Sequence, residues 1–113
     1  MAARITSVIL DCADGPRLAR FWAELLGTEI ESESPNFIFL RQLPDQPRLG
    51  LQPVPEPKTA KNRMHVDLTV DSMPETVAWI KANGGRTLSA NDIGDFQWTT
   101  MADPEGNEFD VHE

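Results

Sequence analysis

An internal repeat is the feature that most restricts how this chain can fold. When the sequence is shifted by 58 residues against itself, its second half aligns with its first without a gap. From residue 4 onward, identical residues then meet at five places: Val8 with Val66, Leu10 with Leu68, Pro16 with Pro74, Gly27 with Gly85, and Asp45 with Asp103. These places correspond to an expected strand, a helix start, a helix end and a turn, where a shared backbone restricts residue type most. The pattern predicts one structural unit that occurs twice.

The same shift also pairs polar residues that are not identical. It places Ser7 on His65 and Gln52 on Asp110. A tandem pair of units forms its cleft between equivalent strands, so we expect the chemistry of the protein at these four positions.

Length and cysteine content limit the class of protein. With 113 residues the chain is long enough for one domain, whereas each half alone would be marginally stable, so the halves are expected to pack together within one chain or by exchange between two. The first ten residues lack the pattern of a signal peptide and no apolar run is long enough to span a membrane. The lone Cys12, expected to be a small buried residue, excludes an internal disulfide. These features predict a cytoplasmic protein.

The charge balance argues against two kinds of partner. Eighteen acidic residues against ten basic ones give a net charge of -8, which disfavours nucleic acid and anionic membrane. A cationic small molecule would be favoured by this field. The alternative interpretation is that surface acid keeps the protein in solution.

The first half has the pattern of one strand, one helix and three further strands. We expect the helix to begin at the cap residue Asp14, with Pro16 in its first turn, and to end at Gly27. The strands are expected at residues 5–12, 29–33, 36–42 and 48–54.

The second half repeats that order after a short proline-bearing linker. We assign module one to residues 4–54, the linker to 55–62 and module two to 63–113, together forming a single domain over residues 1–113. In module two, a helix capped by Ser72 is expected to end at Gly84-Gly85. Its strands are expected at residues 64–70, 86–90, 96–101 and 107–112.

Three segments resemble a known family. They are Phe-Trp-Ala-Glu-Leu-Leu-Gly at 21–27, Met-His-Val-Asp-Leu at 64–68 and Met-Ala-Asp-Pro-Glu-Gly-Asn-Glu-Phe at 101–109. The chain resembles the vicinal oxygen chelate superfamily and, within it, the glyoxalase-like domains of the glyoxalase, bleomycin resistance and dioxygenase type. The resemblance implies an α+β fold of tandem βαβββ modules that form a half-barrel around a cavity. It also implies a homodimer and, in the enzymes, a divalent metal in the cavity.

The family's metal ligands, carried over by motif, fall on Ser7, Gln52, His65 and Asp110. His65, Asp110 and Gln52 have donor atoms that suit zinc, nickel, iron or manganese, whereas the neutral hydroxyl of Ser7 is a poor metal ligand. We therefore assign Ser7 to the binding of the small molecule. In an enzyme, Asp110 would also have to act as the catalytic base. The resemblance therefore implies a metal site in which one ligand is lacking.

Each candidate ligand also has a purely structural interpretation. His65 would need a neighbour such as Asp67 or Thr69 to orient its ring as a ligand, but it could equally be a hydrogen-bonded residue in a polar pocket. Asp110 could be a solvated acid. His112 lies on the same strand face as Asp110 and could replace a missing ligand, or it could be exposed at the end of the chain.

Aromatic residues near these positions suggest a ligand wall. Trp98 and Thr100 share a face of the strand that lines the family's cavity in module two, and Phe37, Phe39 and Arg41 occupy comparable positions in module one. We assign Phe39, Arg41, Asp67, Trp98 and Thr100 to ligand binding, with the hydrophobic core as the alternative for the aromatic rings. Trp22 and Trp79 lie in the helices and are expected in the core.

These observations leave two functions and one default. The first is a small-molecule-binding protein with a divalent metal that acts as a lyase or isomerase. The second is a metal-free protein that sequesters a small cationic or aromatic compound, like bleomycin-resistance proteins. The default is an interaction domain with a vestigial cavity.

Overall fold

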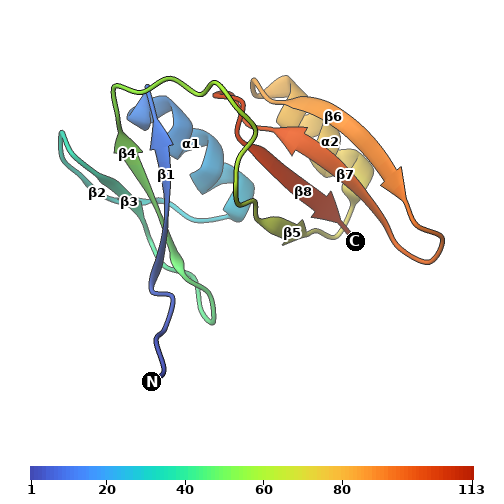
Figure 1. Ribbon diagram of the computed structural model, residues 1–113, viewed down its shortest axis with the longest axis horizontal. Helices are drawn as coiled ribbons and strands as arrows, with labels where there is room; N and C mark the ends of the chain where they lie inside the picture. Colours follow the sequence, from blue (N-terminus) through green and yellow to red (C-terminus); the bar gives the residue numbers. More distant parts are fainter. The chain divides into compact units, whose positions relative to one another are not determined.

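The chain folds into two compact units of the same topology. A computed structural model describes residues 1–113, and it divides into residues 1–57 and 58–113 (Figure 1). Each unit is a βαβββ module, so the predicted α+β class and the predicted repeat are confirmed. Neither helix has the length and apolar character that crossing a membrane requires.

The first unit is one open four-stranded sheet with a helix on one face. Its elements are β1 (Ser7–Cys12), α1 (Gly15–Leu26), β2 (Ile30–Glu33), β3 (Ile38–Leu40) and β4 (Arg48–Pro53). The strand order is β1-β4-β3-β2, in which β1 runs parallel to β4 and the other pairs are antiparallel. The helix α1 packs on β3 and β4, and we call the opposite face of the sheet the open face.

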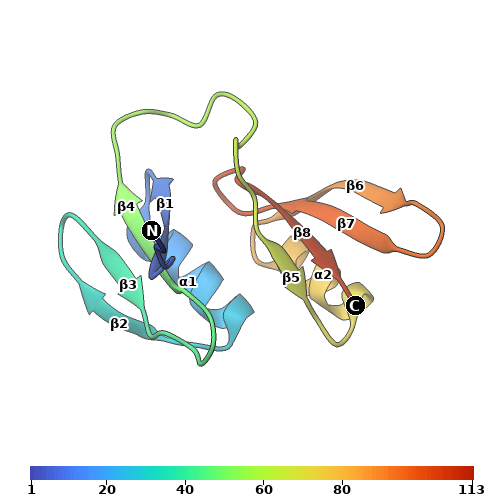
Figure 2. The same cartoon turned by 60° about the horizontal axis from the view of Figure 1, so that its bottom comes forward.

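The second unit repeats this arrangement. Its elements are β5 (Asp67–Thr69), α2 (Met73–Ala82), β6 (Arg86–Asp92), β7 (Gln97–Ala102) and β8 (Glu108–His112), in the strand order β5-β8-β7-β6 (Figure 2). Strand β5 is shorter than the expected 64–70. The carbonyl of Val66 still accepts a hydrogen bond from the Asp110 amide (3.0 Å), but His65 lies before the strand.

The helix caps follow the sequence. Asp14 and Ser72 accept hydrogen bonds from the amides of Arg17 and Glu75, as expected for N-caps. Gly27 ends α1 at a φ of 70°, whereas the left-handed residue after α2 is Gly84, at 95°. Gly85 has a different reason to be glycine, because a Cβ there would lie 2.6 Å from the Ala102 carbonyl oxygen.

The two helices contribute unequally to the core. Helix α1 buries Leu18, Phe21 and Trp22 with the strand residue Cys12, as predicted. Helix α2 buries only Ile80 completely. The prediction that Trp79 lies in the core is wrong, since that ring is only half-buried.

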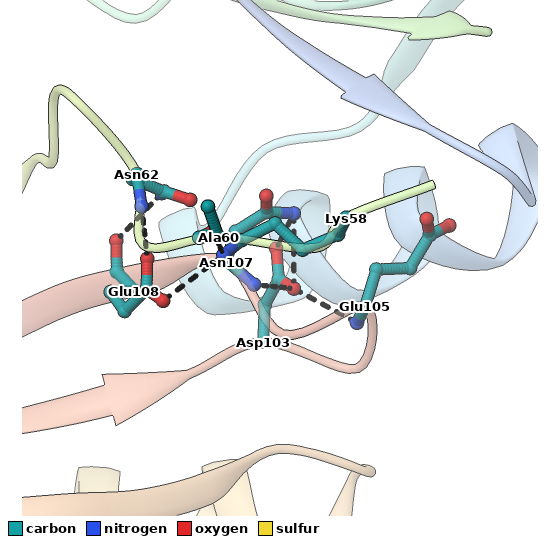
Figure 3. Close-up of polar contacts among 7 residues, drawn as sticks. All are labelled: Lys58, Ala60, Asn62, Asp103, Glu105, Asn107 and Glu108. Carbon is teal, nitrogen blue, oxygen red and sulfur yellow. Dashed lines mark hydrogen bonds and ion pairs between the residues drawn. The ribbon is translucent and has the colours of Figure 1, made fainter. Parts of the chain in front are cut away.

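The end of the linker belongs to the second unit. The carboxylate of Glu108, at the start of β8, accepts hydrogen bonds from the backbone amide of Asn62 (2.8 Å) and from the Lys58 ammonium (3.1 Å) (Figure 3). Burial would raise the pKa of Glu108, but the bonds from Asn62 and Lys58 hold it below the usual range. The segment from Lys58 to Asn62 is therefore fastened along β8.

Candidate functional site

His65, Asp67 and Asp110 come together on the second unit. Parallel pairing sets Asp67 beside Asp110, and the two-residue period of an extended chain puts His65 and Asp67 on the same face. His65 Nε2 lies 3.2 Å from Asp110 Oδ2 and 3.4 Å from Asp67 Oδ1. The Asp110 side chain is 16% exposed, whereas those of His65 and Asp67 are 45% and 62% exposed. The carboxylate of Asp110 is thus mostly buried, and the side chains of His65 and Asp67 beside it are accessible to solvent.

A chain of hydrogen bonds orients the carboxylate of Asp110. Thr100, its cross-strand partner on β7, donates from Oγ1 to Asp110 Oδ1 at 2.7 Å. Asn91 on β6 donates in turn to Thr100 Oγ1 at 3.2 Å and to Ser89 Oγ at 3.1 Å. With Oδ1 fixed by Thr100, Oδ2 is presented to His65.

Sequence reasoning placed Thr100 at this site but missed Asn91 and Ser89. Their spacing of two along a single strand puts them on one face, which was the available signal. The expected strand ended at residue 90, so Asn91 fell outside it, whereas β6 continues to Asp92.

An aromatic group lies next to the carboxylates. The rings of Phe96 and Trp98 stack with centroids 5.6 Å apart, and Phe96 also contacts the His112 ring at 5.2 Å. His112 Nε2 is 3.3 Å from Thr69 Oγ1, so this imidazole is a member of β8 with its own partner and not a frayed end. Phe96, which precedes β7, was the member that sequence reasoning did not assign.

The first unit has a different strand correspondence from the one expected. Ser7 pairs with Arg48, whereas extending the Asp67–Asp110 register by two residues puts His65 opposite Glu108. If Ser7 is matched to His65, Gly50 therefore corresponds to Asp110. Ser7 and Gly50 are 43 positions apart in the sequence, whereas His65 and Asp110 are 45 apart, so the second unit has two more residues between its parallel strands.

Gln52 is displaced by this offset. It corresponds to His112 and lies beside Asp11, four residues along β1 from Ser7. The correspondence of Gln52 with Asp110, expected from the 58-residue shift, is corrected by the strand pairing. The offset could not be seen in the shifted sequence, because Asp45 and Asp103 still coincide there although the strands that follow them pair differently.

The position of Gly50 is covered by an aromatic ring. Phe39 pairs with Gly50 as Thr100 pairs with Asp110, and a Cβ on Gly50 would lie 2.8 Å from the Phe39 ring. Phe37 stacks on Phe39 with centroids 5.8 Å apart, and the Arg48 guanidinium lies 3.9 Å from the Phe39 centroid. This open face is thus an aromatic surface with one cation.

The cation on this aromatic surface is not the expected one. Arg41 pairs with Glu29 at 3.6 Å, in an exposed ion pair at the edge of the unit. Arg48 is the first residue of β4 and was not assigned from the sequence, although its spacing of two from Gly50 indicated the shared face.

The donor atoms of His65, Asp67 and Asp110 can be compared with the needs of a divalent metal. All three donor atoms lie within 4.8 Å of one another. Two ligands bound at about 2.1 Å to a common ion stand about 3.0 to 3.4 Å apart, which the two His65 distances match. The three residues fit a metal, and the equivalents of His65 and Asp110 in the first unit, Ser7 and Gly50, offer only one hydroxyl.

The family model of the glyoxalase-like domain matches residues 7–112 of the chain. The chain belongs to this family. It is a glyoxalase-like domain of the vicinal oxygen chelate superfamily, as its motifs and its tandem βαβββ topology indicated. No protein of curated function matches it.

Solved structures of this superfamily share its fold. An enzyme of the glyoxalase/bleomycin resistance protein/dioxygenase family from Burkholderia phytofirmans PsJN superposes with a TM-score of 0.79 at 19% identity, over 96% of this chain and 97% of that one. The E126Q mutant of the Listeria monocytogenes fosfomycin resistance protein FosX, complexed with Mn(II) and a dihydroxypropylphosphonic acid, gives 0.82 at 14%, over 99% and 90%. Glyoxalase I of Leishmania major gives 0.74 at 19%, over 99% and 87%. At these identities the likeness concerns the fold.

Proposed function

We propose that this glyoxalase-like domain is a small-molecule-binding protein whose recognition site is the open face of the second sheet. The carboxylate of Asp110, which Thr100 orients and His65 contacts, is the observation that carries the proposal. Asp67 adds a second carboxylate within reach of the same point. A cationic group is the ligand chemistry that two adjacent carboxylates favour.

The aromatic group defines the rest of the ligand. Phe96 and Trp98 expose a stacked pair of rings beside the carboxylates, and a planar or cationic organic group gains both buried area and π contact there. The negative charge of the chain favours the approach of a cation. We therefore propose a compact aromatic cation as the ligand class, taken up without chemical change.

Benzyltrimethylammonium is a suitable probe, with benzyl alcohol as its neutral counterpart. We expect the cation to bind more tightly and the Asp110→Asn and Trp98→Ala variants to weaken its binding about tenfold each, as measured by isothermal titration calorimetry. Asp71→Asn makes the same charge change on an exposed loop and should leave binding unchanged. Equal binding of both probes, or no loss in either variant, contradicts the proposal.

The spacing of the donor atoms favours a second candidate, a divalent-metal-dependent lyase or isomerase. His65, Asp67 and Asp110 would hold the ion, which when bound would polarise a substrate oxygen. Asp67 is the most exposed of these three side chains, so it could leave the ion and accept a proton from the substrate. Asp110 then need not be both metal ligand and base.

Elemental analysis of protein purified without chelator or affinity-tag metal separates the two candidates. About one equivalent of zinc, nickel, iron or manganese, lost in His65→Ala, would favour the enzyme. Protein that contains no metal and takes up none on titration with Mn²⁺ would leave the metal-free binding function. Circular dichroism of His65→Ala checks that the variant is folded.

We also propose a homodimer in the cytoplasm. Leu88, Ile93 and Phe96 are large apolar residues exposed along the β6–β7 hairpin, and the single cysteine of the chain, Cys12, is buried and forms no internal disulfide. Light scattering coupled to size exclusion tests the dimer. A mass of one chain at micromolar concentration would contradict it.

A further inference from the structure

A second hollow lies within residues 58–113, apart from the carboxylate cluster. It has a volume of about 750 Å³ and lies between the segment Lys58–Lys61, strand β6 and the turn before β8. The alkyl stem of Lys58 passes over Gly106 in that turn, 4.0 Å from where a Cβ would be. Figure 3 shows this segment running along Glu108 and the Asp103 turn.

The charges around this hollow differ from those of the rest of the chain. Three cationic side chains line it, those of Lys58, Lys61 and Arg86, against two acids, Glu105 and Glu108. Lys58 and Glu108 neutralise each other at 3.1 Å. Lys61 and Arg86 take part in no ion pair and face the single remaining acid Glu105, so a protein with a net charge of -8 retains an excess of positive charge around one concave surface.

The hollow also presents a neutral hydrogen-bond donor. The hydroxyl group of Thr59 lines it together with the cations, whereas the hydroxyl groups of Ser89 and Thr100 already donate to Asn91 and Asp110. A guanidinium with an ammonium and a hydroxyl is the donor set that binds a carboxylate or phosphate, because each group donates to oxygen. Cationic side chains without an acidic partner do not favour a metal or an organic cation.

We propose that this hollow binds an oxyanion, namely the carboxylate or phosphate group of a small molecule, through Arg86 and Lys61. The surrounding backbone is held in place before any ligand arrives, because Asn62 and Lys58 are both bonded to Glu108. A ligand that meets a fixed surface loses less entropy on binding.

Thr100 connects this hollow to the carboxylate cluster. Its side chain lines the hollow and donates to Asp110 at 2.7 Å. If the proposed function holds, a single ligand can span both places, with a cationic group at Asp67 and Asp110 and an acidic group at Arg86. This part of the inference rests on the proposed function and names a zwitterionic ligand class, whereas the oxyanion site stands without it.

The test is a titration of the full-length ¹⁵N-labelled protein with inorganic phosphate and, separately, with acetate, at constant pH and ionic strength. We expect saturable shifts of the Ser89, Thr100 and Gly106 amides. The double variant Lys61→Gln/Arg86→Gln should bind at least about tenfold more weakly. The ion with the lower dissociation constant identifies phosphate or carboxylate as the preferred group.

The double variant Arg17→Gln/Lys81→Gln is the matched control, since it changes the net charge equally and both residues lie on helices outside the hollow. It should bind phosphate and acetate like the wild type. Equal loss in both double variants would mean attraction by the general field, and no saturable shift with either ion would mean no site. Either result overturns the inference. Asp110→Asn should bind both ions at least as well as the wild type, because the oxyanion site does not use this carboxylate. The proposed function can therefore fail while the oxyanion site is confirmed, and the two outcomes can be told apart.

Discussion

The open faces of the two sheets have the same topology and opposite chemistry. In the second unit, Thr100 and Asp110 face each other across β7 and β8 and join His65 in a polar cluster. In the first unit, Phe39 and Gly50 take those places, and the ring fills the space that a side chain on Gly50 would need. The backbone of the fold therefore determines which positions face each other on the sheet. The residue types at those positions decide whether the surface carries polar groups that can bind a ligand or is filled by an aromatic ring.

We expect the largest difference in stability between the two units at the turns before β4 and β8. Asp103 is 1% exposed and accepts hydrogen bonds from the amides of Glu105 and Asn107 and from the Asn107 side chain. Asp103→Ala should lower the free energy of unfolding by about 3 kcal/mol, since it leaves buried donors without an acceptor. Chemical denaturation monitored by circular dichroism measures the loss.

Asp45, its repeat partner, is the matched control. It is exposed at a φ of 61°, so Asp45→Ala should cost only the strain of a left-handed alanine, at most about 1 kcal/mol. Equal losses at Asp45 and Asp103 would show that the two turns are stabilised in the same way.

Gly50 tests whether the closed face can be reopened. Gly50→Asp should destabilise the protein by about 2 kcal/mol, because its Cβ would meet the Phe39 ring at 2.8 Å and Ile9 at 2.9 Å. The double variant Gly50→Asp/Phe39→Thr, which copies the Asp110–Thr100 pair, should recover part of that loss. Thermal unfolding of both variants and of Phe39→Thr alone gives the coupling energy. An additive double variant would argue against direct contact of the two side chains.

The two units should also differ in how their stability depends on pH, since Glu108 in the second unit corresponds to Arg48, of opposite charge, in the first. Its pKa is lower in the folded protein than in the unfolded chain, so its contribution is complete above the unfolded value of about 4.3 and is lost as the pH falls through the folded pKa. Glu108→Gln should cost about 1 kcal/mol at pH 7 and less below pH 4. Glu31→Gln, on the exposed edge strand β2, should change stability at neither pH. A loss in Glu108→Gln that is equal at both pH values would contradict the role of its charge.

The sequence predicted the elements better than it predicted their alignment. Caps such as Asp14 and Ser72 and the period of the strands are local signals, and these were read correctly. Strand pairing depends on contacts between distant residues, and the repeat hid its change because Asp45 and Asp103 still align in the ungapped shift. Gln52 was therefore matched to the wrong residue of the second half.

The candidate site was predictable where one strand face carries its residues. Thr100 and Asp110 were both named from the sequence and lie within hydrogen-bond distance. Arg48 and Asn91 were missed for physical reasons, because the partner of an aromatic ring depends on strand register and because a strand end is weakly marked in sequence. The linker was likewise treated as a spacer, although Glu108 fastens part of it.

The two additional residues between the parallel strands of the second unit have a consequence for how the two halves could diverge without unfolding. Side chains of a strand alternate between faces, so a difference of one residue would have sent Leu51 outward and Gly50 into the core. A difference of two moves each residue by a full period and leaves the core unchanged. Even-numbered length changes between these strands are thus the ones by which a duplicated half can exchange the residues of its surface while it retains its interior.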